Sequence, residues 1–333
     1  MDAQEQKTAV AALSVASNSA LVAGKVVVGI ATGSVSVISE AAHSAVDLLA
    51  AVIALFAVRK SGEPADREHP FGHGKVENIS GTIEALLIFL AAGWIVYEAV
   101  RKIMRPAPIE NTGWAVGVML ASSLVNLGVS HLLFRTGKRT DSLALQADAW
   151  HLRTDVYTSV GVMGGLALIW LGGRLAPGVP LGWLDPVAAM AVAALIVKAA
   201  WDLTRQSARD LLDTSLPAEE QAIVRNIITA HAPVARAYHR LKTRKSGADR
   251  FIEFHLLVAA DMTVQDSHEL TRVMEHEMHG KLARATVTIH VEPCHAACTP
   301  DCLRDCVLDD DKRRRVSERP GSGGSPEPPS EEG

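Results

Sequence analysis

The stretch Ser39-Glu-Ala-Ala-His43-Ser-Ala-Val-Asp47 places ionisable side chains inside an otherwise apolar segment, Val35–Val58. A helix crosses the hydrocarbon core of a bilayer with about 20 mainly apolar residues, and this segment is long enough to do so. His43 and Asp47 are four residues apart, so both project from one face of such a helix. Because an ionisable residue inside a membrane is costly, this pair indicates a functional site.

The same spacing recurs in Leu145-Gln-Ala-Asp148-Ala-Trp-His151-Leu-Arg-Thr-Asp155, where His151 and Asp155 form the second pair. Two imidazoles and two carboxylates from two helices make a complete tetrahedral shell for zinc. The alternative is a pair of His–Asp hydrogen bonds or polar contacts between helices, but the identical spacing in two segments favours a metal site. Glu40 and Asp148 are expected near the membrane surface, where they would only cap or orient other groups. Asn18 and Lys25 are expected to be helix-packing or interfacial groups rather than ligands.

Six windows of the chain have the length and apolar character of membrane spans. They are Ala9–Ile30, Val35–Val58, Ile79–Val100, Trp114–Phe134, Leu143–Leu171 and Leu184–Leu203. Lys and Arg gather in the loops after the second and fourth windows, which predicts that both termini are cytoplasmic. A cluster after the third window, Arg101, Lys102 and Arg105, runs against this rule. We expect an integral protein of the inner (plasma) membrane, with the lipid bilayer as its surroundings.

From Pro217 onward the pattern changes to that of a soluble α+β unit. Its expected elements are a helix over Pro217–Ala230, strands over Tyr238–Lys245 and Phe251–Val258, a helix over Val264–Leu282 and a strand over Thr286–Val291. This αββαβ order predicts a small, ferredoxin-like two-layer sandwich. The expected domains are residues 1–209 in the membrane, 210–293 as the cytoplasmic unit, and 294–333 as a Cys-rich and then disordered tail.

Several function classes are disfavoured. The net charge of −4 and the absence of a long basic stripe argue against a nucleic-acid partner. No Gly-rich phosphate loop follows a strand, so ATP-driven pumping has no support. The run Glu275-His276-Glu277-Met278-His279 is one residue short of the zinc-protease signature. We therefore expect no enzyme; a hydrolase would need an open coordination position and a general base.

Together with His69-Pro-Phe-Gly-His73-Gly-Lys75-Val-Glu77, these features resemble the cation diffusion facilitator family over nearly the whole of Thr8–Pro293. The resemblance implies a homodimeric metal exporter driven by proton exchange. It also implies an intramembrane transport site made of His43, Asp47, His151 and Asp155. Some members have Asp at the first position; His there favours zinc over manganese and iron, although cobalt and cadmium can use the same shell.

The resemblance implies two further metal sites, where Zn²⁺ would be a structural or regulatory ion. A loop site would consist of Asp66, His69 and His73, with a solvated polar loop as the alternative. A binuclear site in the cytoplasmic domain would consist of His239, His255, His268, His290 and Glu292. Any one of these histidines could instead be a surface residue. The resemblance also suggests a salt bridge between protomers from Lys75 to Asp213.

All four cysteines lie in one segment that has no counterpart in the family pattern. They recur at every fourth position: Cys294, Cys298, Cys302 and Cys306. Reduced thiolates this close could bind zinc or copper(I), and inert thiols or disulfides are the alternatives. Pro300 argues against a continuous helix through them.

The predicted function is export of a divalent transition metal, most plausibly Zn²⁺, in exchange for protons. Metal and protons would compete for one midplane site while the helices rock around it. The alternative is a membrane metal sensor or scaffold that binds without transporting. A sensor needs no ligands at mid-bilayer depth, so the intramembrane pairs favour transport.

Overall fold

The computed structural model describes residues 2–33, 35–104, 113–175, 184–295 and 303–317. The chain forms two compact units, Met1–Leu212 and Asp213–Gly333. The boundary lies three residues beyond the expected one at 209, because the last helix of the first unit continues to Leu211.

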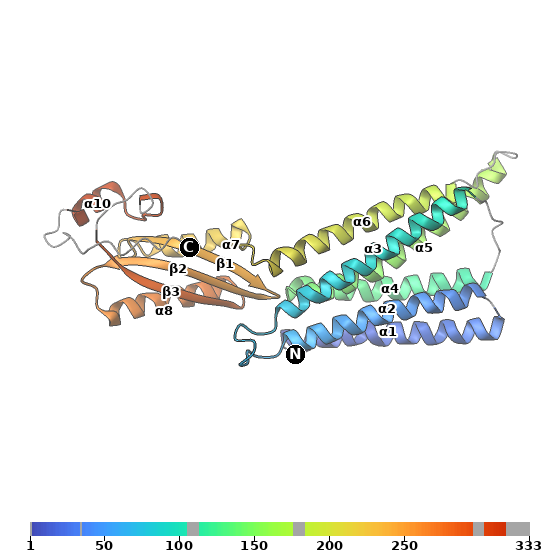
Figure 1. Cartoon of the computed structure of the whole chain (residues 1–333), viewed down its shortest axis with the longest axis horizontal. Coiled ribbons are helices and arrows are strands. Elements are labelled where there is room, and N and C mark those ends of the chain that lie inside the picture. The colour runs from blue at the N-terminus through green and yellow to red at the C-terminus, as the bar shows by residue number, and fades with distance from the viewer. Residues whose placement is uncertain (1, 34, 105–112, 176–183, 296–302, 318–333) are drawn as a thin grey trace. The chain divides into compact units, whose positions relative to one another are not determined.

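Six long helices make up the first unit (Figure 1). They are α1 (Ala3–Thr32), α2 (Val35–Ser61), α3 (Lys75–Met104), α4 (Gly113–Arg139), α5 (Leu143–Leu175) and α6 (Leu184–Leu211). Each contains one of the six expected windows, and five carry a stretch long and apolar enough to span a membrane. Within its described residues α5 has no such stretch; its first half carries Asp148, Arg153 and Asp155.

Local signals set the limits of α1. Oδ1 of Asp2 accepts the backbone N–H of Glu5 at 2.7 Å, and the Glu5 carboxylate accepts the N–H of Asp2 at 3.0 Å. This capping box satisfies N–H groups that the first turn leaves unpaired. Gly33 ends the helix with φ +64°, a conformation that glycine adopts without steric cost.

Helix α5 lies at the centre of the packing, because it contributes to both apolar clusters of the bundle. One cluster joins α1, α2, α4 and α5, with Leu145 and Leu152 completely buried. The other joins α3, α5 and α6 around Ile88 and Ile196. A Cβ atom added to Gly161 of α5 would lie 2.7 Å from a Val192 methyl group, so glycine permits the close approach of α6.

The second unit is a three-stranded sheet with two helices in a separate layer. Its elements are α7 (Ala218–Ala230), β1 (Ala237–Ser246), β2 (Asp249–Ala259), α8 (Val264–Lys281), β3 (Ala285–Cys294) and α10 (Asp310–Ser317). The strand order is β1-β2-β3; β1 pairs antiparallel with β2, and β3 pairs parallel with β2 after the α8 crossover. The expected αββαβ order and two-layer arrangement are confirmed.

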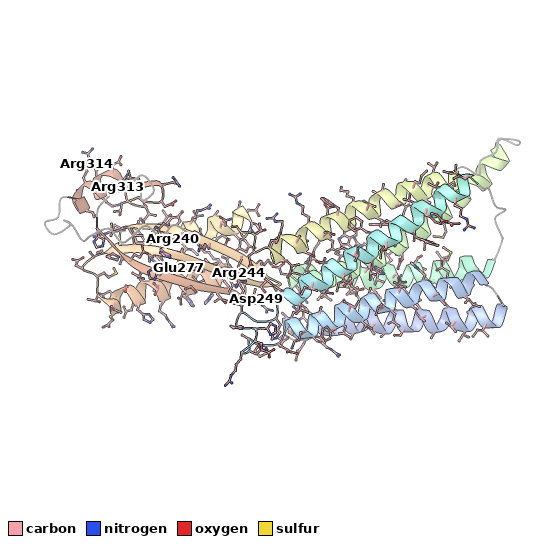
Figure 2. The ribbon with its side chains drawn as sticks, viewed as in Figure 1. Arg240, Arg244, Asp249, Glu277, Arg313 and Arg314 are labelled. Carbon is pink, nitrogen blue, oxygen red and sulfur yellow. The ribbon has the colours of Figure 1, made fainter. Side chains whose placement is uncertain are left out.

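Alternation along β2 separates the two faces of the sheet. Ile252, Phe254 and Leu256 are buried against α7 and α8, so the intervening residues face the other side. Gly247, with φ +59°, allows the two-residue turn into β2. Asp249 lies at the start of β2 (Figure 2). Its carboxylate accepts two hydrogen bonds from Arg284, at 2.7 and 3.1 Å.

Helix α10 departs from the expectation that the tail after the cysteine-rich segment is disordered. The Asp309 carboxylate accepts the backbone N–H of Lys312 at 2.8 Å and also pairs with its ammonium group at 2.8 Å. One position further on, Arg313 pairs with Asp310 at 2.5 Å. Capping and i,i+3 charge pairs stabilise this short helix. The prediction of disorder rested on the polar composition of the tail and did not take these pairs into account.

Candidate metal centres

Helices α2 and α5 bring the two predicted His–Asp pairs together. Nε2 of His151 lies 3.1 Å from Oδ1 of Asp47, so the pairs are joined across the two helices. Nε2 of His43 lies 3.5 Å from Oδ1 of Asp155 and 4.0 Å from Oδ1 of Asp47. Ligand atoms of His43, Asp47 and Asp155 all fall within 4.8 Å of one another, and His151 adjoins them through Asp47.

Burial leaves part of this group without hydrogen-bond partners. The side chains of Asp47 and His151 are 4% and 7% exposed, whereas His43 is half exposed. Nδ1 of His151 and Oδ2 of Asp155 are buried and lack a hydrogen-bond partner. Buried polar atoms are usually satisfied, so unpaired ones in a mixed nitrogen and oxygen set are consistent with a site for a borderline metal ion as substrate.

Two buried carboxylates beside this group were not predicted as site residues. Asp148 of α5, expected near the membrane surface, is completely buried one turn before His151. Glu84 of α3 is also completely buried. Both oxygens of Asp148 and Oε2 of Glu84 lack hydrogen-bond partners. The signal for Glu84 was available, since it and Glu98 are the two acids of the apolar window Ile79–Val100.

Of the two polar residues of α1, Lys25 contacts another helix and Asn18 bonds within its own. Nζ of Lys25 lies 3.3 Å from Oε2 of Glu40 and donates to Oγ of Ser44 at 2.8 Å, which ties α1 to α2. The Asn18 amide donates to the carbonyl of Ser14, one turn earlier in the same helix. These contacts satisfy the polar groups without placing them among the metal-ligand candidates.

The predicted loop site assembles between α2 and α3. Nε2 of His73 lies 3.2 Å from Oδ2 of Asp66, and Nδ1 of His69 lies 3.4 Å from Oδ1 of the same carboxylate. The backbone N–H of His69 holds the pKa of Asp66 below its usual range, so the carboxylate is ionised at neutral pH. His73 is buried; its Nε2 approaches Asp66 without the geometry of a hydrogen bond, and its Nδ1 has no hydrogen-bond partner. This unmet bonding capacity fits a zinc ion bound at the loop.

In the second unit, three histidines form a row across the open face of the sheet. His239 pairs in register with His255, and His255 with His290, so one comes from each strand. Glu292, two residues after His290 on the same face, lies 2.8 Å from Nε2 of His239 and 2.6 Å from Nδ1 of His255. Its Oε1 lies 3.7 Å from Nε2 of His290. Three imidazoles around one carboxylate fit a zinc shell.

The charge of this carboxylate is stabilised by the row. Partial burial alone raises the pKa of Glu292, but hydrogen bonds from His255 and His239 outweigh burial and hold it below the ordinary value. His268, also predicted as a ligand, is exposed on α8 and lies outside the group that the structure brings together. The helical layer holds it apart from the row in the sheet.

The remaining predicted residues are placed as follows. Lys75 donates to the carbonyl of Leu211 at 3.4 Å, and Asp213 pairs with Arg244 at 3.4 Å. Cys294 ends β3, while Cys306 forms an isolated bridge to β1; neither is in a disulfide. Cys298 and Cys302 lie outside the described residues.

The fold and these sites define a class of protein: an integral membrane protein with candidate metal-ligand groups inside its helical unit and on a separate α+β domain. A family model for the cation efflux transmembrane domain matches residues 11–212, and one for the cation efflux protein cytoplasmic domain matches residues 216–294. The chain belongs to the cation diffusion facilitator family, as its motifs predicted, and is a cation efflux transporter.

Two relatives of similar sequence agree with this assignment. An uncharacterised transporter of Synechocystis sp. is 37% identical over 262 residues, which cover 79% of this chain and 82% of the relative. The cation-efflux pump FieF of Yersinia pestis is 33% identical over 263 residues, covering 79% and 85%. A solved metal-bound C-terminal domain of the CzcD transporter from Thermotoga maritima is 33% identical and covers 23% of this chain and 94% of that one, with a TM-score of 0.21.

Proposed function

We propose that this protein exports a divalent transition metal, zinc before others, from the cytoplasm in exchange for protons. The observation that carries the proposal is the convergence of His43, Asp47, His151 and Asp155 from two helices of the bundle. If the pairs served only to hold α2 and α5 together, one His–Asp pair would be enough. A second pair supplies the number and type of donors that zinc requires.

The donor set favours zinc. Two imidazole nitrogens and two carboxylate oxygens suit a borderline ion that accepts tetrahedral geometry. Manganese and iron prefer more oxygen ligands and higher coordination numbers, so the histidine at position 43 disfavours them. Cobalt and cadmium ions fit the same shell as secondary substrates.

Proton exchange follows from the chemistry of the ligands. Imidazole and carboxyl groups must lose their protons before they bind a metal ion, so metal and protons compete for the same atoms. A site open to the cytoplasm would bind metal and release protons. The same site, open to the other side, would bind protons and release metal. Rocking of the helices around a fixed site provides this alternation, and the proton gradient drives net export.

The other sites supply a regulatory layer in this proposal. In a homodimer with both termini cytoplasmic, zinc on the histidine row would stabilise one arrangement of the paired α+β domains and bias transport. A bridge from Lys75 to Asp213 would join protomers near an inner membrane surface. The loop group Asp66, His69 and His73 and the cysteine segment would capture metal at the cytoplasmic face.

The test is metal flux in proteoliposomes with an imposed pH gradient, comparing zinc, cobalt, cadmium, iron and manganese. We expect zinc flux that requires the gradient and is abolished by Asp47→Ala and by Asp155→Ala. Asp202→Ala, which removes an exposed carboxylate from α6, is the matched control and should transport normally. Zinc binding without flux, in folded and correctly oriented protein, would overturn the transport proposal in favour of a sensor.

A further inference from the structure

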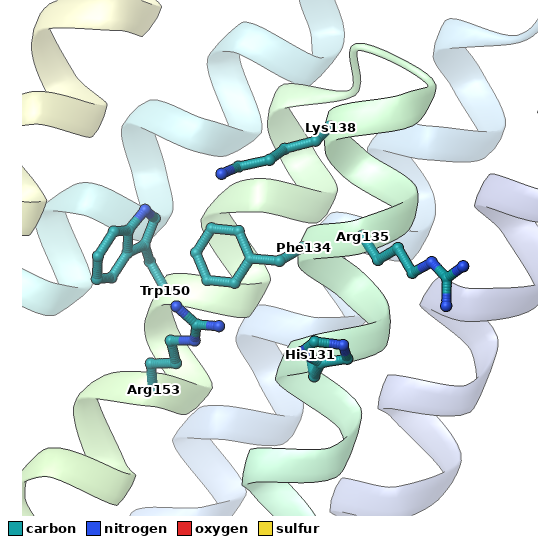
Figure 3. A pocket seen from close by; sticks show the side chains of 6 residues that line it. All are labelled: His131, Phe134, Arg135, Lys138, Trp150 and Arg153. Carbon is teal, nitrogen blue, oxygen red and sulfur yellow. The ribbon is translucent and has the colours of Figure 1, made fainter.

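A pocket of about 380 Å³ lies between α4 and α5, on the side chains of His131, Phe134, Arg135, Lys138, Trp150 and Arg153 (Figure 3). Three of these six side chains carry a permanent positive charge, two are aromatic, and none is acidic. The metal ligands lie elsewhere on α5. His151 and Arg153 are two positions apart on this helix, so they project from nearly opposite faces.

Two of the cations converge on one aromatic ring. The guanidinium carbon of Arg153 lies 4.2 Å from the centroid of the Phe134 ring, and Nζ of Lys138 lies 6.0 Å from it. Trp150 meets Phe134 edge-on, with 5.2 Å between ring centroids. Figure 3 shows Lys138 and Arg153 on either side of the ring, while Arg135 extends the other way from α4.

No carboxylate of the described residues lies within salt-bridge distance of Lys138 or Arg153. The buried lysines of the same bundle differ: Lys7 pairs with Glu77 and Lys25 with Glu40. An aromatic ring attracts a cation but does not neutralise it, and two like charges near one ring repel each other. The two cations therefore have no acidic partner among the described residues, and an anion from outside the chain could neutralise them.

The position of the pocket along the helices indicates that its anionic partner comes from the lipid. Lys138 is in the last turn of α4, and Arg153 is about 15 Å along α5 from its first residue. The pocket thus extends from the end of the bundle into the part that faces lipid. Trp beside Arg and Lys is typical of the interface between headgroups and hydrocarbon, and basic pockets between membrane helices bind anionic headgroups.

We propose that this pocket binds the phosphate group of an anionic phospholipid, held by Lys138 and Arg153, with the acyl chains along the apolar surface of α4 and α5. Inorganic phosphate offers the same charge but no acyl chains. The lipid fits better because the exposed side chains on α4, including Leu132 and Leu127, provide an apolar surface beside the pocket. This inference does not depend on the metal that is transported.

The test is lipid binding to the full-length protein in detergent micelles, followed by native mass spectrometry. Phosphatidylglycerol and phosphatidylcholine with identical acyl chains are compared, and inorganic phosphate is added as a competitor. We expect phosphatidylglycerol to bind at least tenfold more tightly than phosphatidylcholine. Lys138→Gln/Arg153→Gln should weaken phosphatidylglycerol binding by roughly 30-fold, since each cation near a membrane surface contributes about a factor of five.

Two further variants make the result specific. Arg205→Gln/Arg209→Gln removes two exposed cations from α6 and should leave the lipid preference within about twofold of the original. Lys138→Arg/Arg153→Lys keeps both charges and should keep the preference, which covers the case in which the glutamine variant fails to fold. Equal affinity for the two lipids would overturn the proposal. So would unchanged binding by the glutamine variant, or displacement of the lipid by millimolar inorganic phosphate.

Discussion

Nζ of Lys7, near the start of α1, lies 2.7 Å from Oε1 of Glu77 at the start of α3, with both side chains at most 2% exposed. Ser61, at the end of α2, donates to the same oxygen at 2.7 Å, and Ser142, just before α5, donates to Oε2. One carboxylate therefore connects four helices at one end of the bundle. A buried ion pair is stable only when its remaining polar atoms are also satisfied, and both oxygens of Glu77 have partners here.

Removing one partner of this pair should destabilise the bundle strongly. We expect Lys7→Met to lower the free energy of unfolding by about 3–5 kcal/mol, because it leaves the Glu77 charge buried and unpaired. Lys7→Met/Glu77→Leu should recover much of that loss. Thermal unfolding in detergent measures both effects. Lys60→Met, which breaks an exposed pair with Glu63, is the control and should cost less than about 1 kcal/mol. Equal losses for Lys7→Met and Lys60→Met would contradict the structural role of Glu77.

Metal selectivity should follow the ligand at position 43. In His43→Asp, a hard oxygen donor replaces imidazole nitrogen next to Asp155. We expect the ratio of manganese flux to zinc flux to rise by about tenfold, because manganese favours carboxylate ligands. Proteoliposome flux with each metal in turn measures the ratio. His279→Asp alters an exposed histidine of α8 and should leave the ratio unchanged. An unchanged ratio of manganese to zinc flux in His43→Asp would argue against a role of residue 43 as a ligand.

Glu84 should limit stability, since its carboxyl group is completely buried and only partly hydrogen-bonded. Ser80 approaches Oε1 at 3.3 Å, and Oε2 has no partner. We expect Glu84→Leu to raise the free energy of unfolding by about 1–3 kcal/mol, because it removes the desolvation cost. The comparison is Glu98→Leu, on the exposed part of α3, which should change stability by less than about 0.5 kcal/mol. A marked loss of stability in Glu84→Leu would mean that the carboxyl group has a partner required for folding.

Glu292 should make the metal-free protein more stable at neutral than at acidic pH. Its pKa in the folded state is below the ordinary value, so the unfolded state binds more protons in the acidic range. The stabilisation is complete above the ordinary glutamate pKa of about 4.3 and disappears as the pH falls through the lower, folded value. Glu292→Gln should therefore be less stable than the original at pH 7, and the difference should shrink on acidification.

Unfolding of the EDTA-treated protein across this pH range tests that expectation. Glu253→Gln, an exposed residue on the same strand as His255, is the matched control and should show no comparable pH dependence. If the difference between Glu292→Gln and the original protein were the same at every pH, the hydrogen bonds from His239 and His255 would not stabilise the carboxylate.

The sequence by itself determined the helical unit, the order of the α+β elements and the four intramembrane ligand candidates. The reason is that these features are local or periodic. Runs of apolar residues mark spans, alternation marks strands, and a spacing of four puts His43 and Asp47 on one helix face. Spacing alone could not show that His151 lies against Asp47 rather than against its own helix partner Asp155.

Only the tertiary structure decided contacts between residues far apart in the chain. The register of three strands aligned His239, His255 and His290 into a row and kept His268 in the other layer. Helix packing buried Asp148 and Glu84 together, and paired Lys7 with Glu77 across 70 positions. The packing of α4 on α5 placed both Lys138 and Arg153 beside Phe134. Such contacts depend on how side chains from separate elements fill the same space, and no local pattern in the sequence encodes that.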